Sequence, residues 1–512
     1  MDLNDVLGAE EFGNATPATP EAENASTAVA SEHSKPLDPP AAITNKQYAS
    51  LPPSTPRRIH ILGTGSIGKL IAHSLRGLPT PPPVTLLFHR YKLLEAWQRG
   101  KKEIVLQTNG VDVGRGGFDV ELKPEITIQH GVVLEKSQAD VYDTREQGIL
   151  PHEAAKVLGQ QAIERREQTP ERRDALSGLG PNEEEEQQTL VRRRRPGARA
   201  GRGDWAESNE PIASLIVTTK AGITISALSA IRHRLTRETT ICFLQNGMGV
   251  IDDVNTQLFP DEATRPSYVQ GIITHGVNVP QGVAESNPFF AVHAGLGTLA
   301  LGVVPRAPPS DNNEEAKDPD IDCPPTSRHL IRSLTASPVL CAAAFTPIEL
   351  LQLQLEKLAV NSVLNPLTSL VDARNGAILY NFSLTRTMRL LLAETSLVLR
   401  SLPEIKHLPN TALRFSAERL ERLVVGVANK TSENISSMLA DVRNGRKTEI
   451  EYINGYIVKR GEEVGVRCVV NYAIMMTVVG KTMIVSREVR GEVPVEEGFT
   501  EEPKVQGRVE RY

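Results

Sequence analysis

Short apolar runs alternate with stretches of helical spacing through the first half of the chain. Four runs read as buried strands and two stretches between them as helices: strands at Arg58–Leu62, Val84–Phe88, Leu215–Thr218 and Thr240–Leu244, helices at Gly68–Leu75 and Ile225–Leu235. Because strand–helix–strand alternation is typical of a parallel sheet covered by helices on both faces, this half predicts an α/β doubly wound sheet.

The pattern changes beyond about Pro347, where long helical stretches replace the short runs. We expect helices over Leu350–Leu364, Thr385–Leu402 and Thr448–Val464. The predicted fold is therefore an α/β N-terminal doubly wound sheet of the Rossmann type over residues 57–346, followed by an all-α C-terminal domain over residues 347–512.

Three polar stretches interrupt this pattern. Residues 1–56 hold eight prolines and little apolar pattern, so we expect a disordered tail. Residues 133–210 contain the acidic run Glu183–Glu186 and the basic run Arg192–Arg195, which favours a solvated insertion over a basic arm for RNA. Residues 305–327, rich in Pro and acidic side chains, are interpreted as a further loop.

Composition excludes several classes of protein. The 512 residues carry a formal net charge of −5, so no global cationic field favours nucleic acid or a membrane surface. The four cysteines have no CxxC spacing, which excludes a disulfide framework and a cysteine zinc site. No apolar run reaches the ~18 residues that a spanning helix needs. We expect no metal and a cytoplasmic location, with a mitochondrial one left open.

A glycine-rich turn follows the first predicted strand and opens the first helix. The GxGxxG pattern spans Gly63, Thr64, Gly65, Ser66, Ile67 and Gly68. In this context Gly63 makes the tight turn, Gly65 lets a pyrophosphate approach the backbone, and Gly68 lets helix and strand pack closely. The sequence therefore predicts a dinucleotide whose phosphates lie at the N-terminus of the helix.

The residues after the second predicted strand indicate which dinucleotide. An NAD site places Asp or Glu there to bind the ribose 2′-hydroxyl, but this chain has His89, Arg90 and Lys92. Because a guanidinium pairs with a 2′-phosphate that a carboxylate would repel, Arg90 favours NADPH as the cofactor.

Further polar clusters lie where ligands bind in such folds. Lys220 and Asn246 each follow a strand of the predicted sheet, at its carboxyl edge. Lys357, Asn361 and Asn365 are spaced i, i+4, i+8, so they lie on one face of a helix. Asparagine is a poor helix former that makes directional hydrogen bonds of both kinds, which favours a binding role over a solvated face.

These clusters resemble the ketopantoate reductase (2-dehydropantoate 2-reductase) family. The resembling motifs are the glycine turn, Thr-x-Lys220, Gln-Asn246-Gly-Met-Gly, Lys357-Leu-x-x-Asn361-x-x-x-Asn365-Pro and Ser437-Met-Leu-x-Asp…Thr-Glu449. The segments Gly271–His275 and Val292–Gly297 look like the family's antiparallel extension of the sheet.

The resemblance implies NADPH-dependent reduction of 2-dehydropantoate to pantoate, a step toward coenzyme A. It also implies the site roles. Lys357 is carried over as the catalytic lysine and Glu449 as the catalytic carboxylate beside it. Lys220 and Asn246 are carried over to the cofactor, and Asn246, Asn361, Asn365 and Ser437 to the substrate.

Two alternatives stay open at this stage. The same scaffold would suit a reductase of another 2-oxo acid, because pocket-lining residues are not readable from sequence. A non-catalytic NADP-binding relative acting as an interaction protein is the other, supported by the charged insertion but opposed by the complete set of polar site residues. A small-molecule 2-oxo acid is the expected partner, and a homodimer is left open.

Overall fold

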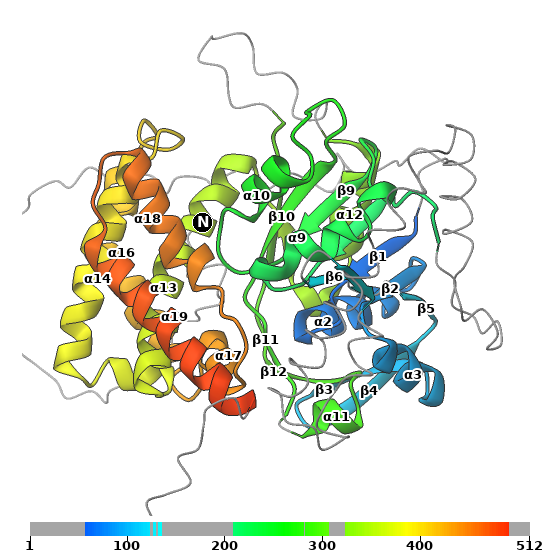
Figure 1. The fold of residues 1–512 in the computed structure, drawn as a ribbon. Helices are drawn as coiled ribbons and strands as arrows, with labels where there is room; N and C mark the ends of the chain where they lie inside the picture. Colours follow the sequence, from blue (N-terminus) through cyan, green and yellow to red (C-terminus); the bar gives the residue numbers. More distant parts are fainter. Residues whose placement is uncertain are drawn as a thin grey trace, which may run out of the picture.

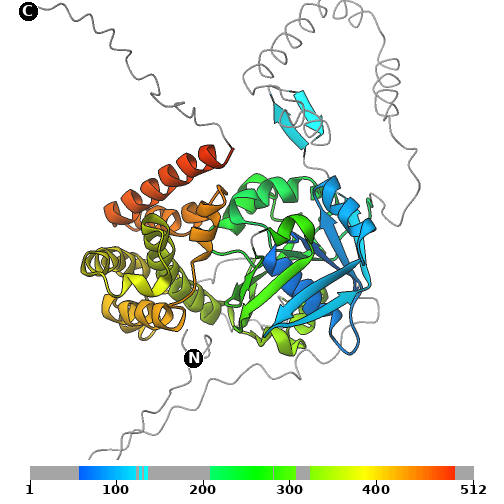
Figure 2. The ribbon, with the colours of Figure 1, turned by 90° about the horizontal axis from the view of Figure 1, so that it is seen from below.

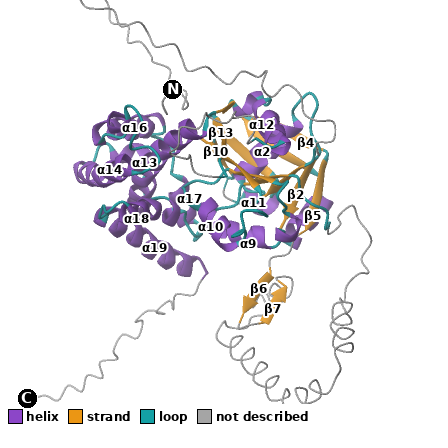
Figure 3. Cartoon of the chain, turned by 90° about the horizontal axis from the view of Figure 1, so that it is seen from above, coloured by secondary structure: helices purple, strands orange, loops and turns teal. Residues whose placement is uncertain are grey.

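The structure is a computed structural model that describes residues 57–122, 126–129, 132–135, 208–280, 282–306 and 323–490. The predictions for the tail at residues 1–56, for most of the insertion at 133–210 and for the centre of the loop at 305–327 lie outside the described residues. Strands gather in one part of the molecule and long helices in the other (Figures 1 and 3). We call these parts the sheet lobe and the helical lobe.

The sheet lobe is built on an eight-stranded sheet of order β14-β13-β10-β9-β8-β1-β2-β5. Its strands are β1 (Ile59–Leu62), β2 (Val84–Phe88), β5 (Phe118–Leu122), β8 (Ser214–Val217), β9 (Thr240–Phe243), β10 (Ser267–Ile273), β13 (Leu299–Val304) and β14 (Ala342–Ala344). The strands from β5 to β10 pair in parallel, which confirms the predicted doubly wound sheet.

The predicted antiparallel extension of the sheet is right for one of its two segments. Gly271–Ile273, at the end of β10, pair antiparallel with Leu299–Leu301 of β13, whereas the start of β10 pairs in parallel with β9. The segment Val292–Gly297 lies mostly in β12, which belongs to a second sheet. The two apolar runs resemble neighbouring strands in sequence, but only the pairing partner decides the direction and the sheet.

The second sheet has the order β11-β12-β3-β4, and a separate two-stranded pair joins β6 to β7. Their bounds are β3 (Glu103–Thr108), β4 (Val111–Gly116), β6 (Ile126–Gln129), β7 (Val132–Glu135), β11 (Gly276–Asn278) and β12 (Phe290–Gly295). The second sheet packs against the helix α2 (Ser66–Arg76), which it shares with the central sheet.

Alternation along the central strands divides the buried side chains of the sheet lobe into two cores. Ile216 and Cys242 face the core that contains α2, whereas Val217 and Phe243 face the core on the opposite side. The helices of the lobe are α2, α3 (Tyr91–Arg99), α9 (Ala221–Ser229), α10 (Val250–Gln257), α11 (Val283–Ser286) and α12 (Pro325–Thr335), with 3-10 turns η2 (Arg232–Arg234) and η3 (Pro338–Leu340). Both faces of the sheet are therefore covered.

The helical lobe surrounds one long helix, α13 (Pro347–Val371). Around it lie η4 (Asn375–Ile378), α14 (Phe382–Ser401), α15 (Thr411–Arg414), α16 (Ala417–Lys430), α17 (Ser437–Arg443), η5 (Ile450–Tyr452), α18 (Asn454–Glu463) and α19 (Val469–Arg490). A third apolar core fills the space between them. The predicted all-α second half is confirmed over the described residues.

The ends of α13 follow from local chemistry. Thr346 and Glu349 form a reciprocal capping box and Pro347 occupies the first turn, where no amide hydrogen is needed. Pro366 lies inside the helix and cannot donate to the carbonyl of Ser362. The side-chain amide of Asn454 donates to that carbonyl at 2.9 Å, so the helix continues through the proline.

Among the described residues, one helix segment, Val469–Val489 of α19, is long and apolar enough to span a membrane by length and composition. This segment was not expected from the sequence, because charged residues interrupt its apolar run. One such helix is weak evidence for a membrane, although only 17% of its apolar window is buried inside the molecule. Here α19 contacts α18, α13 and α14, and the side chain of Asn471 is fully buried against Glu394 and Asn454.

The two lobes meet along the carboxyl edge of the central sheet (Figure 2). The Nζ atom of Lys357 on α13 donates to the carbonyl of Ile273 at the end of β10, at 2.7 Å. The amide of Met248, in the loop after β9, donates to the carbonyl of Tyr452 in η5, at 2.8 Å. These contacts bring the predicted site residues of both lobes to one place.

Candidate active site

The glycine turn has the geometry that a dinucleotide phosphate requires. Gly63 has a φ of +103°, and a Cβ at Gly68 would lie 1.9 Å from the carbonyl oxygen of Gly63. A Cβ at Gly65 would meet nothing within 4 Å, so open space faces the start of α2. The first turn of α2 carries no acidic residue that would repel an anion. The three expected glycine functions fit this structure, and the turn suits a pyrophosphate.

The predicted 2′-phosphate residue lies where it was expected. Arg90 is exposed and precedes α3 directly, two residues after the end of β2. Within the described residues no carboxylate pairs with it. Its guanidinium is therefore available to an anion beside the glycine turn.

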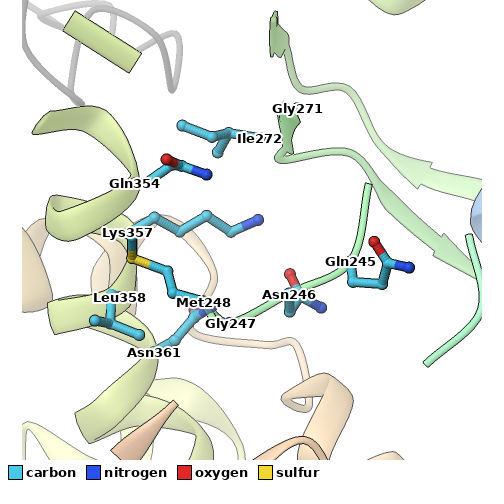
Figure 4. A pocket seen from close by; sticks show the side chains of 10 residues that line it. All are labelled: Gln245, Asn246, Gly247, Met248, Gly271, Ile272, Gln354, Lys357, Leu358 and Asn361. Atoms are coloured by element: carbon cyan, nitrogen blue, oxygen red, sulfur yellow. The ribbon is translucent and has the colours of Figure 1, made fainter. Parts of the chain in front are cut away.

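An open pocket lies between the lobes (Figure 4). The loop after β9, the strand β10 and the helix α13 form its walls. It is lined by Gln245, Asn246, Gly247, Met248, Gly271, Ile272, Gln354, Lys357, Leu358 and Asn361. Three predicted site residues, Asn246, Lys357 and Asn361, thus share one pocket although 115 residues separate the first from the last.

Lys357 extends from α13 across this pocket toward the sheet lobe (Figure 4). Burial lowers the pKa of its ammonium to about 8, and the nearby negative charge of Glu449 opposes that shift. The hydrogen bond to the carbonyl of Ile273 fixes its Nζ atom. A lysine with this pKa holds a proton near neutral pH and releases it readily.

Glu449 is buried and joins the two lobes. Its Oε1 atom accepts from the backbone amide of Ala221 at 3.0 Å, and Oε2 accepts from the side-chain amide of Asn246 at 3.4 Å. Oε2 also lies 3.5 Å from the Nζ atom of Lys220. No hydrogen bond links Glu449 to Lys357 in the described part of the chain; the carboxylate acts on that lysine through its charge.

Lys220 lies in a network of charges at the edge of the cleft. Its Nζ atom pairs with Asp441 of α17 at 2.8 Å, and Asp441 also lies 3.3 Å from Arg446. Burial opposes the charge of Lys220, but the carboxylates of Glu449 and Asp441 outweigh it and raise its pKa. Lys220 of the sheet lobe therefore keeps its positive charge, which pairs with Asp441 of the helical lobe.

Two predicted substrate residues are outside the pocket. Asn365 is buried on α13, two turns beyond Lys357, and Ser437 is exposed at the start of α17. The buried neighbour Ser436 caps α17 instead, accepting from the amide of Leu439. The substrate roles of Asn365 and Ser437 stay predictions.

Several residues that line the pocket were not predicted from the sequence. Gln354 precedes Lys357 by three residues on α13, so helical spacing could have identified it. Gln245 belongs to a motif in which only the following asparagine was assigned. Gly271 and Ile272 carry no chemical signal in the sequence, because they line the pocket through their place at the end of β10.

Together, the two lobes, the glycine turn and the lysine in the pocket are typical of a two-lobed, dinucleotide-dependent oxidoreductase. Two family models match the chain: "Ketopantoate reductase PanE/ApbA" over residues 165–306 and "Ketopantoate reductase PanE/ApbA C terminal" over residues 349–482. The glycine turn lies before both matched ranges, so its assignment rests on its geometry.

Three similar proteins illustrate the range of this family and fold. A probable 2-dehydropantoate 2-reductase of Schizosaccharomyces pombe is 35% identical over 269 residues, 52% of this chain and 73% of the relative. The ketoisovalerate reductase BEA2 of Gibberella fujikuroi is 25% identical over 464 residues, 82% of this chain and 83% of the relative. A ternary structure of D-mandelate dehydrogenase with NADH and anilino(oxo)acetate shares the fold, with a TM-score of 0.51 at 16% identity, covering 84% of this chain and 99% of that chain.

The chain belongs to the ketopantoate reductase family. Its fold class and its membership of an oxidoreductase family, both predicted from the sequence, are confirmed. Among the described residues, no group of three or more His, Cys, Asp and Glu side chains is placed to hold a metal ion.

Proposed function

We propose that this protein is an NADPH-dependent 2-dehydropantoate 2-reductase, which reduces the ketone of 2-dehydropantoate to the alcohol of pantoate. The observation that carries this proposal is the partly buried Lys357, held by the Ile273 carbonyl in a pocket that also contains Asn246 and Asn361. The identity to a probable 2-dehydropantoate 2-reductase supports the choice of substrate.

The chemistry divides between the cofactor and the residues of this chain. The glycine turn would hold the phosphates of a reduced nicotinamide dinucleotide, which would supply the hydride when bound. The ammonium of Lys357 polarises the substrate ketone and gives its proton to the oxygen as negative charge develops there. Asn246 and Asn361 offer amide hydrogens to the substrate carboxylate without adding a permanent charge.

Glu449 prepares this step in two ways. Its charge favours the protonated form of Lys357, against the effect of burial. Its bonds to Ala221 and Asn246 hold the sheet lobe against the helical lobe, so the pocket residues from both lobes keep their spacing. Glu449 would thus keep the proton donor charged and the pocket assembled.

A second candidate is a reductase of another branched 2-oxo acid. The match to a ketoisovalerate reductase extends over 464 residues, far more of this chain than the match to the 2-dehydropantoate 2-reductase. The probable 2-dehydropantoate 2-reductase has the higher sequence identity to this chain, which favours 2-dehydropantoate as the substrate.

An NADPH-oxidation assay on the purified full chain tests the proposal. We expect the highest kcat/KM with 2-dehydropantoate, a lower one with 2-oxoisovalerate and the lowest with phenylglyoxylate. A higher kcat/KM with 2-oxoisovalerate would select the second candidate. No oxidation with any 2-oxo acid, in a chain that still binds NADPH, would favour a non-catalytic relative.

Arg90 tests the choice of cofactor. If its guanidinium pairs with the 2′-phosphate, Arg90→Ala weakens NADPH binding by about 10–100-fold, as expected for loss of a charge-assisted bond, and leaves NADH binding nearly unchanged. Lys92→Ala is the matched control, an exposed cation on the adjacent α3. Dissociation constants by cofactor fluorescence are the readout, and equal losses for both cofactors would dismiss the 2′-phosphate role.

A further inference from the structure

Gln354 is a polar side chain that neither the sequence motifs nor the proposed mechanism uses. It lies on α13 one turn before Lys357, lines the same pocket and is only 9% exposed. Figure 4 shows its amide on the side of Lys357 that faces Ile272, away from Leu358 and Asn361. Within the described residues its amide has no hydrogen-bond partner.

The neighbouring polar residues of α13 differ from Gln354 in this respect. The side chain of Gln352 accepts from Arg414 at 2.8 Å. The fully buried Glu356 accepts from Arg414 at 2.9 and 3.1 Å and from Arg419 at 2.6 Å. These residues therefore have structural partners within the helical lobe, whereas the amide of Gln354 faces the pocket.

The surroundings of Gln354 define what it can bind. The pocket also contains the apolar side chains of Met248, Ile272 and Leu358, which suit the methyl groups of a branched carbon chain. A carboxamide offers both a donor and an acceptor, so a hydroxyl group satisfies it in either sense. Burying it against an alkyl group leaves it without a partner, which costs free energy.

We propose that Gln354 is a specificity-determining residue that binds a hydroxyl group on the carbon chain of the 2-oxo acid. The inference rests on the proposed function, because it concerns the substrate of the same pocket. 2-Dehydropantoate carries a hydroxymethyl group that 2-oxoisovalerate lacks, so Gln354 favours the binding of 2-dehydropantoate over that of 2-oxoisovalerate. Gln354 changes the ratio of the kcat/KM values for the two substrates, whereas Lys357 interacts with the ketone that both substrates have.

The experiment compares 2-dehydropantoate and 2-oxoisovalerate with NADPH in the wild type, Gln354→Leu and Gln352→Leu. We expect Gln354→Leu to lower kcat/KM for 2-dehydropantoate by about 10–100-fold and to leave that for 2-oxoisovalerate unchanged or raised. Gln352→Leu is the matched control on the same helix, and it should leave the ratio of the two values unchanged.

An unchanged ratio in a folded Gln354→Leu variant would overturn the inference while leaving the proposed function intact. Gln354→Met, which keeps the length of the side chain, gives the same test if the leucine variant fails to fold. If the wild type reduces neither substrate, the proposed function fails. The dissociation constants of pantoate and 2-hydroxyisovalerate, the two products, then still decide the role of Gln354: pantoate must lose affinity in the variant, and equal affinities would refute it.

Discussion

Two lysines near Glu449 have pKa shifts of opposite sign. Burial dominates for Lys357 and lowers its pKa to about 8, whereas carboxylates dominate for Lys220 and raise its pKa. The difference follows from contact, because Lys220 pairs with Asp441 and Glu449 while Lys357 bonds to a neutral carbonyl. One lysine is therefore suited to give up a proton, and the other to hold a fixed charge.

This contrast predicts the pH dependence of the reaction. The proton donor is the ammonium of Lys357, which is present below its pKa and lost above it, so kcat/KM for reduction should fall as the pH rises through about 8. Lys357→Ala should lower kcat by about 10²–10³-fold while NADPH still binds. Lys357→Arg, which stays charged at all accessible pH values, should be slow but should lack the fall above pH 8. A fall that persists in the arginine variant would assign it to another group.

At the scale of elements, local patterns predicted most helices and strands but not their ends. The helix expected over Leu350–Leu364 extends to Val371 because Asn454, far along the chain, replaces the hydrogen bond that Pro366 cannot make. The single helix expected over Thr448–Val464 is divided into η5 and α18. Glu449 lies before that break, so its position depends on a turn that periodicity does not show.

The glycine turn offers a test at the same scale, with a control inside the motif. A Cβ at Gly68 would overlap the carbonyl of Gly63, so Gly68→Ala must separate α2 from β1 and should lower the free energy of unfolding by about 2–4 kcal/mol. A Cβ at Gly65 would point into open space, so Gly65→Ala should stay within about 1 kcal/mol of the wild type but weaken NADPH binding. Urea unfolding and cofactor titration measure both. Equal losses of stability would contradict the packing role of Gly68.

At the scale of the whole molecule, the sequence predicted which residues meet only where a family motif marked them. Asn246, Lys357 and Asn361 were expected at one site and share one pocket. Gln354 and Ile272 could not be predicted in the same way, because the pocket forms only when the end of β10 meets α13. The site is a property of the contact between the lobes, and no single segment contains it.

That contact depends on Gly247, in the loop between Asn246 and Met248. Its φ is +82°, and a Cβ there would lie 2.5 Å from the carbonyl oxygen of Tyr452 in the helical lobe. Gly247→Ala should push the loop away from η5, displace Asn246 relative to Lys357 and lower kcat/KM at least tenfold, since misplaced groups react slowly.

Gly249→Ala isolates this effect from backbone strain. Gly249 also has a positive φ, +95°, but its Cβ would meet only the ring of Tyr456, at 3.3 Å. Both variants should lose about 1–2 kcal/mol of stability from the left-handed conformation. Only Gly247→Ala should also lower kcat/KM, when the rate is measured at a temperature where both proteins are folded. Equal kcat/KM in the two variants would mean that the pocket tolerates a displaced loop. The contact between the loop at Gly247 and η5 would then not control the reaction.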